Sequence, residues 1–286
     1  MRPSTPFPRP WLWTGSSTGL VCFVCLLLLV WAGSGCAPLQ REAPSVSPEK
    51  ADGIWSAFWS RQERIASLPG ASLRGSLNIF TPEQKRRITF ELWGSPPTPL
   101  RLHLRAGLGT TISMWEIRGD RILIFSPRNN QAYIAENTAQ ATAAMGLRLP
   151  FSLPRMTQLL TGSWSELLPR QYERYQALPQ ERYAFYPRGK QRIDRVVLDH
   201  KSRIVALSGD SPHGWRLERK ELTTRQGRVL SQRLELTTQR HEELILRIKA
   251  FDPRSDPWPE EDLRLDLPAD TQMRSLGAPE SGSRTE

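Results

Sequence analysis

Alternation of apolar and polar residues is the feature that most constrains how this chain can fold. In the run Leu100–Arg105, every leucine is followed by an arginine or a histidine, and Ile88–Trp93 repeats the pattern. Successive side chains of a strand point to opposite faces of a sheet, so a period of two indicates strands that bury one face. The chain is therefore expected to build a sheet with one apolar face.

The alternation recurs along most of the chain, in segments separated by short turns rich in Gly, Pro or Asn. Segments joined by such short turns pair antiparallel. The expected strands are 72–80, 88–93, 100–105, 110–117, 121–125, 131–135, 183–186, 192–198, 203–207, 215–222, 229–237 and 243–251, with a last edge strand at 263–267. A single sheet of this size curls. We therefore predict a mainly β fold with helices, in which about 11–12 strands form an open, unclosed antiparallel β-barrel.

An amphipathic helix is expected ahead of the first strand. Ser47-Pro48 has the composition of a helix start, and apolar residues follow at helical spacing as far as Ile65. This helix is expected to end near Gly70.

A helical insertion is expected between the two runs of strands. It consists of an Ala-rich helix over 138–145 and a second helix from Leu153 to Leu160, which Gly162 stops. Residues 163–180 are polar and are expected to be irregular. Since helices are the other elements able to cover the concave apolar face, we predict that they form a lid over it.

The N-terminus has the features of an export signal. A basic leader precedes the apolar run Leu20–Ala32, which at about 1.5 Å per residue is too short to cross a hydrocarbon core of roughly 30 Å. Three small residues then lead to Cys36, as in a bacterial lipobox, with Gly33 where leucine is usual. We expect residues 1–35 to be a cleaved signal peptide and Cys36 to carry lipid.

An uncleaved membrane anchor over 11–32 is the alternative interpretation, which a Gly- and Ser-rich interruption disfavours. Residues 36–47 are rich in Pro and Ser and are predicted to be a flexible tether. Cys22 and Cys25 lie in the signal peptide, so the mature chain would keep Cys36 alone and form no disulfide.

Composition limits the partners of the chain. The formal net charge is +10, but nucleic acid is a poor partner for an exported protein. Anionic lipid headgroups fit a basic surface better, and a solvated basic face is the alternative. The folded domain is expected over 48–270, followed by a disordered tail over 271–286.

Catalysis is not predicted. The four histidines are far apart in the sequence and lack metal-ligand spacing: His103, His200, His213 and His241. No nucleophile elbow or phosphate-binding loop is present. We expect a protein that is not an enzyme and holds no metal or cofactor.

An apolar cavity is expected on the inner face of the sheet. Its predicted lining residues are Phe90, Leu92, Leu102, Leu104, Met114, Ile122 and Ile124 from the strands, with Met156, Leu159 and Leu160 from the lid helix. Periodicity does not distinguish a cavity from a core, so a close-packed interior stays the alternative.

Three short motifs follow one another in a recognisable order: Leu102–Thr110, Leu149–Pro154 and Leu159–Gly162. Together with the order of elements over 50–250, they resemble LolB, a family of outer-membrane lipoproteins in the LolA/LolB lipoprotein-localisation superfamily. The resemblance implies an open antiparallel barrel with helices over a cavity that holds acyl chains. It also implies a monomer, anchored by lipid and facing the periplasm, which accepts lipoproteins from a LolA-like carrier and delivers them to the outer membrane.

The resemblance extends to one loop. LolB-like proteins carry a protruding leucine between the third and fourth strands, which they need for inserting lipoproteins into the membrane. Here the matching residues are Gly107, Leu108 and Gly109, and the flanking glycines leave Leu108 few neighbours to pack against. The alternative is that Leu108 folds back onto the sheet edge. An envelope assembly or scaffold lipoprotein, using the same fold as a protein-interaction surface, is the alternative function.

Overall fold

The computed structural model describes residues 47–276, apart from 66, 83, 108, 145, 147–148, 190–191, 210–213 and 241. The described residues belong to one compact unit. The expected signal peptide, the Cys36 lipidation site, the tether up to residue 46 and Leu108 lie outside the described residues.

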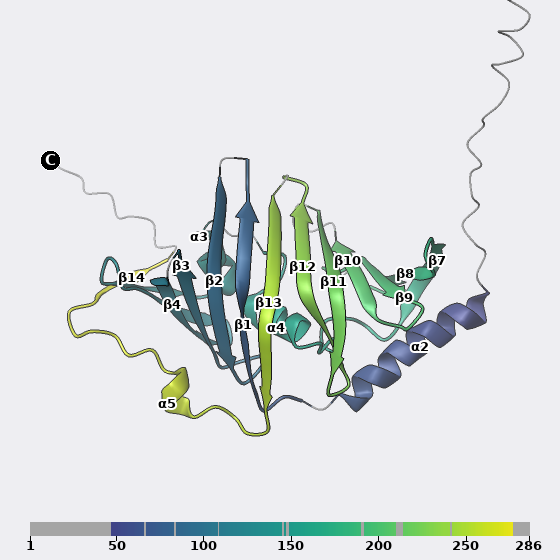
Figure 1. Ribbon diagram of the computed structural model, residues 1–286, viewed down its shortest axis with the longest axis horizontal. Coiled ribbons are helices and arrows are strands. Elements are labelled where there is room, and N and C mark those ends of the chain that lie inside the picture. Colours follow the sequence, from purple (N-terminus) through teal and green to yellow (C-terminus); the bar gives the residue numbers. More distant parts are fainter. Residues whose placement is uncertain are drawn as a thin grey trace, which may run out of the picture. The chain divides into compact units, whose positions relative to one another are not determined.

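Fourteen strands form a single sheet within the described residues, in the order β14-β6-β5-β4-β3-β2-β1-β13-β12-β11-β10-β9-β8-β7 (Figure 1). The strands are β1 (Gly70–Phe80), β2 (Lys85–Gly94), β3 (Leu100–Ala106), β4 (Thr110–Arg118), β5 (Arg121–Ser126), β6 (Gln131–Ala135), β7 (Tyr172–Leu178), β8 (Arg182–Pro187), β9 (Arg195–Asp199), β10 (Ile204–Gly209), β11 (Trp215–Arg225), β12 (Arg228–Thr238), β13 (Glu243–Arg254) and β14 (Gln272–Ser275).

The sheet is unclosed, because β14 and β7 stand at its two ends. Neighbouring strands pair antiparallel except β14, which runs parallel to β6. The predicted mainly β fold with an open antiparallel sheet is thus confirmed, with two strands more than the upper expected number. One long ladder, between β1 and β13, joins the meander β1–β6 to the meander β7–β13.

Strand β7 lies where an irregular segment was expected, so that prediction is wrong. The pairing of β7 with β8 contains an irregularity between Tyr172 and Arg174. Its apolar residues are Tyr172, Tyr175, Ala177 and Leu178, which do not follow a period of two. As the last strand of the sheet it also has one neighbour and a largely exposed face, so its sequence lacks the pattern of a half-buried strand.

Helix α2 (Pro48–Arg64) packs against the β7–β9 end of the sheet (Figure 1). The Trp55 ring lies 4.9 Å from Phe185 and 5.6 Å from Tyr172 between ring centroids. Its indole N–H donates to the carbonyl of Arg170 at 2.7 Å. The helix ends at Arg64, before the predicted Gly70, and Ile65 after it already has extended backbone angles.

Tyr172 completes the contact between α2 and the sheet. Its hydroxyl donates to the Asp52 carboxylate of α2. Burial, followed by the bond to Asp52 and its negative charge, raises the pKa of Tyr172 to about 12. The hydroxyl is therefore neutral and available as a donor throughout the physiological pH range.

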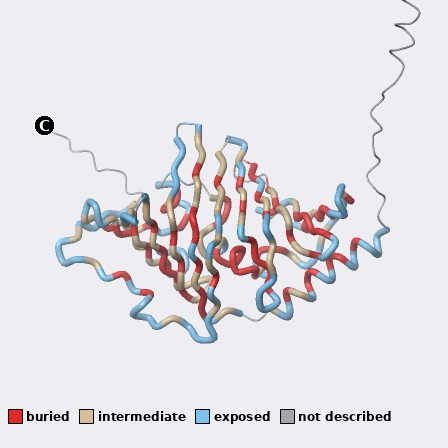
Figure 2. Tube along the Cα trace, in the orientation of Figure 1, coloured by how far each residue is buried: buried red, intermediate tan, exposed pale blue. Residues whose placement is uncertain are grey.

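The two helices of the insertion lie on the concave side of the sheet. They are α3 (Thr138–Ala144) and α4 (Leu153–Leu160), as the sequence predicted. Pro154 stands in the first turn of α4, and the chain leaves the helix through Gly162, whose φ of 76° suits glycine. Buried residues concentrate in the central strands and on α4 (Figure 2).

The C-terminal segment crosses the outer face of the first meander. It contains α5 (Glu260–Leu263), and the backbone N–H of Leu265 donates to the Glu116 carboxylate at 2.6 Å. Leu265 packs with Phe125 and Ala132. The leucine alternation at 263–267 therefore reflects burial against this face, and the edge strand expected there is instead β14.

The C-terminal boundary also differs from the expected one. Residues 272–275 form β14 and extend the sheet beyond position 270, whereas residues 277–286 lie outside the described part. None of the described helices is long and apolar enough to span a membrane.

We predict that the C-terminal segment contributes to the stability of the whole domain. Leu263 is 1 % exposed, so Leu263→Ala removes buried methyl groups and should lower the free energy of unfolding by about 2–3 kcal/mol in urea denaturation. Met273 is 50 % exposed, and Met273→Ala should change it by less than about 0.5 kcal/mol. Equal effects of the two substitutions would contradict this packing.

Candidate functional site

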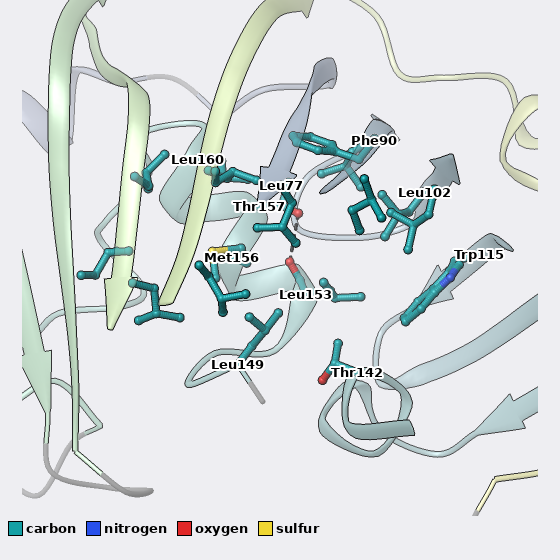
Figure 3. A pocket seen from close by; sticks show the side chains of 18 residues that line it. Leu77, Phe90, Leu102, Trp115, Thr142, Leu149, Leu153, Met156, Thr157 and Leu160 are labelled. Atoms are coloured by element: carbon teal, nitrogen blue, oxygen red, sulfur yellow. Dashed lines mark hydrogen bonds between the residues drawn. The ribbon is translucent and has the colours of Figure 1, made fainter. Parts of the chain in front are cut away.

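An apolar cavity of about 120 Å³ lies between the central strands and the two inserted helices (Figure 3). The strands supply Leu77, Ile88, Phe90, Leu92, Leu102, Leu104, Trp115, Leu217, Leu234, Leu236, Leu244 and Leu246. The lid supplies Thr142 from α3, Leu149 ahead of α4, and Leu153, Met156, Thr157 and Leu160 from α4. Both meanders therefore contribute to one lining.

Strand register explains why these side chains meet. On the inner face, Phe90 pairs with Leu104 and Leu92 pairs with Leu102 across β2 and β3. The β1–β13 ladder places Leu77 opposite Leu246. The resulting rows of leucines continue from one meander into the other and form one apolar surface.

Two threonines are the polar side chains in this lining, and both are satisfied within their own helices. The Thr142 hydroxyl donates to the carbonyl of Thr138 at 2.9 Å. The Thr157 hydroxyl donates to the carbonyl of Leu153 at 3.0 Å (Figure 3). The cavity thus offers dispersion contacts and hydrophobic burial in place of polar recognition.

Contacts at both ends hold α4 over the cavity. Before the helix, Phe151 packs edge-on against Trp215 at 4.9 Å, and Arg192 donates to the carbonyl of Pro150 at 3.1 Å. After the helix, Arg228 donates to the carbonyl of Thr161 at 3.1 Å. A cation at this end also complements the helix dipole. Helix α4 is therefore held in place at both ends, and its central residues face the cavity.

A buried arginine supports the segment that follows α4. The Arg219 guanidinium lies 5.1 Å from the Trp164 ring and donates to the carbonyls of Ile204 and Val229 at 3.0 and 2.7 Å. Burial, with a smaller contribution from the charge of Arg203, lowers the pKa of Arg219 to about 9. Arg219 therefore stays charged at neutral pH, where it links two strands and packs against Trp164.

Six of the residues expected to line a cavity do so: Phe90, Leu92, Leu102, Leu104, Met156 and Leu160. Ile122, Ile124 and Leu159 are buried in the surrounding core, away from the cavity lining. They contribute to the packing that supports the cavity wall.

The prediction that Met114 lines the cavity is wrong, because Met114 packs on the outer face beside Phe125 and Leu265. The pairing of β3 with β4 changes register at Leu104, so the inward parity of β4 switches near Ile112. Trp115 consequently faces the cavity in place of Met114. The sequence pattern could not locate this bulge, since both parities of β4 carry apolar residues.

Sequence analysis also failed to predict that residues of the second meander line the cavity. Leu217, Leu234, Leu236, Leu244 and Leu246 carry the same alternation as the first meander. The pattern shows that they are buried, but the pairing of β1 with β13 decides that they face the same cavity.

The turn between β3 and β4 is sharply bent. Gly107 and Gly109 have φ of 53° and 103°, and the Gly109 N–H donates to the carbonyl of Ala106 at 3.2 Å. A Cβ added at either glycine would meet no atom within 4 Å. The two described residues of this turn therefore stand clear of their surroundings.

The cavity has an energetic cost that a close-packed core would avoid. Protein interiors are normally filled to the density of organic crystals. At the value measured for enclosed voids in truncated cores, this volume corresponds to at most about 3 kcal/mol. The fold tolerates this cost in a region lined mostly by leucine.

Comparison of the sequence with protein-family models and with curated proteins gives no match. Among solved structures, a LolA superfamily protein from Nitrosomonas europaea aligns over 74 % of this chain and 97 % of its own, at 10 % identity and a TM-score of 0.49. A domain described as a candidate outer-membrane lipoprotein-sorting protein from Vibrio parahaemolyticus aligns over the same shares, at 12 % identity and 0.48. A DUF1329 family protein from Desulfovibrio piger aligns over 74 % of this chain and 98 % of its own, at 8 % identity and 0.48. At these values, the functional argument has to come from the cavity itself.

We predict that two residues of α4 respond differently to truncation. Leu159 is 1 % exposed and packed, so Leu159→Ala should lower the free energy of unfolding by about 3 kcal/mol. Met156 faces the cavity and is only partly buried, so Met156→Ala should cost about 1 kcal/mol. Urea denaturation measures both values. An equally large loss for Met156→Ala would mean that the space beneath α4 is packed.

Proposed function

We propose that this chain is a lipid-anchored envelope protein that takes the acyl chains of lipoproteins or lipids into the cavity beneath α4. One observation carries the proposal: the lining is apolar, and its two threonine hydroxyls are engaged inside their helices. Such a site suits a ligand that is itself a hydrocarbon chain. Burial contributes about 0.8 kcal/mol per methylene group, so a long chain needs no polar contact within the cavity.

The size of the cavity adds a requirement for movement of the lid. About 120 Å³ is less than the roughly 300–1,000 Å³ of typical ligand sites. Entry of an acyl chain therefore requires α4 to move outward. Helix α4 suits this movement because it is short, attached at its ends, and underpacked where it faces the cavity.

The proposed location follows from the N-terminal sequence and from the resemblance to LolB. Cleavage before Cys36, acylation of Cys36 and a flexible tether would hold the domain at a membrane surface. Ala37 after the cysteine resembles the outer-membrane sorting pattern. In this proposal the domain faces the periplasm, receives cargo from a LolA-like carrier, works as a monomer and delivers cargo to the outer membrane without catalysis.

The small volume of the cavity also favours a second candidate function. In an envelope scaffold lipoprotein, the same sheet would serve as a partner surface, and α4 would not need to move. The two candidates differ in whether the folded protein takes up an acyl chain.

We predict that the full-length chain binds a fluorescent fatty-acyl probe. Leu153→Asp places a carboxylate in the lining and should weaken binding at least about tenfold, because the charge would have to be buried beside the chain. Leu267→Asp adds the same charge in the C-terminal segment and should bind like the unaltered chain. A flat titration with folded protein would contradict acyl binding and favour the scaffold function.

We further predict that the β3–β4 turn acts in delivery. Leu108→Glu should block transfer of a bound fluorescent acyl probe from the chain to phospholipid vesicles, because a carboxylate is costly to insert into a bilayer. Probe binding should stay unchanged. Gln226→Glu, at the β11–β12 turn, provides the control and should transfer normally. Undiminished transfer by the Leu108→Glu variant would show that this loop does not contact the membrane.

A further inference from the structure

Besides the cavity beneath α4, a smaller space lies within the sheet, between β12 and β13. These strands pair only over the short stretch from Arg233–Arg247 to Thr237–Glu243. In contrast, β12 pairs with β11 and β13 pairs with β1 along nearly their whole lengths. Beyond the short stretch the two strands diverge in front of α4 (Figure 1), and a slot of about 30 Å³ lies between them.

Local features of both strands produce this divergence. On β13, the register with β1 moves from Gly75–Ile248 to Arg74–Ala250, which leaves Lys249 as an extra, bulged residue. A Cβ on Gly75 would lie 2.2 Å from the carbonyl of Arg247, so the bulge requires glycine opposite it. Bulges bend a strand and increase its twist.

The matching feature on β12 is Ser231. Its hydroxyl lies 2.7 Å from the carbonyl of Lys220 and 2.6 Å from that of Arg233. These contacts hold the backbone on either side of Gln232, which is exposed although it lies between inward-facing Leu230 and Leu234. Both strands therefore turn away from each other at the same level.

The slot adjoins the main cavity. Leu160 of α4 lines both spaces. The inner part of the slot is apolar, with Leu73, Leu230 and Phe251 around Leu160. A hydrocarbon chain lying beneath α4 could thus continue into the slot without meeting a polar side chain at its inner end.

The other part of the slot is basic. Arg225 and Lys249 line it and are exposed. Neither makes an ion pair with a described acidic residue, and no acidic side chain lines the slot. Further along β11 and β12, by contrast, Lys220 and Arg233 are paired with Glu235. Two unpaired cations beside an apolar channel are complementary to a hydrocarbon chain that ends in an anion.

We infer that the exposed rim of the slot binds the phosphate of an anionic phospholipid whose acyl chain lies in the cavity beneath α4. Arg225 and Lys249 then contact the phosphate through charge-assisted hydrogen bonds. This inference rests on the proposed function and specifies its substrate class.

Two probes with identical fluorescent acyl chains test the inference on the full-length chain: phosphatidylglycerol, which carries a phosphate, and diacylglycerol, which does not. The unaltered chain should bind the phosphatidylglycerol probe about tenfold more tightly, the effect of one charge-assisted contact. The double variant Arg225→Gln and Lys249→Gln should lose this preference and keep its affinity for the diacylglycerol probe.

A matched double variant on α2, Lys50→Gln and Arg64→Gln, removes the same charges away from the slot and should keep the preference. Equal binding of the two probes by the unaltered chain, or a preference that survives in the slot variant, overturns the inference and leaves acyl binding intact. If the slot instead accepts an extended peptide, the unaltered chain should bind the two probes equally. Failure of the folded chain to bind either probe overturns the proposed function and this inference together.

Discussion

The ladder between β1 and β13 is the interaction on which the rest of the structure depends. It pairs Gly70–Phe80 with Glu243–Arg254, two segments at opposite ends of the domain's sequence. Without it, each meander would expose its own apolar face. With it, Leu77 and Leu246 become neighbours, and the leucines of both meanders face one concave surface. The cavity, the lid and the slot between β12 and β13 all follow from this single long-range pairing.

The concave surface is larger than the inserted helices can fill. Helix α4 has eight residues and is attached through Phe151 before it and Thr161 after it, so its middle leaves space against the strands. Close packing elsewhere in the core makes this space the point where a ligand gains most from burial. The same geometry explains why the proposed ligand is a chain: rows of leucine provide continuous apolar contact but no fixed polar group.

Particular elements show why the sequence led to most of the fold but to only part of the site. Helix α4 could be predicted because Pro154 and Gly162 mark its ends and its apolar spacing is local. Strand β7 could not, because an irregularity disturbs its alternation and the sheet edge leaves it exposed. Residues 263–267 were expected to form an edge strand, but Leu265 packs instead on the outer face of β4–β6. Met114 was placed on the wrong side because the bulge near Ile112 exchanges the two faces of β4.

The sequence by itself determined most of the segments that become strands, most of the residues that these strands bury, and where the inserted helices begin and end. These properties depend on neighbouring residues, through side-chain alternation, helix periodicity and the backbone preferences of proline and glycine. Tertiary structure alone decided that Leu217, Leu236 and Leu244 share a cavity with Leu102, and that Arg225 and Lys249 meet at one slot. These groupings depend on strand pairing and bulges, which bring distant residues together and leave little trace in local sequence.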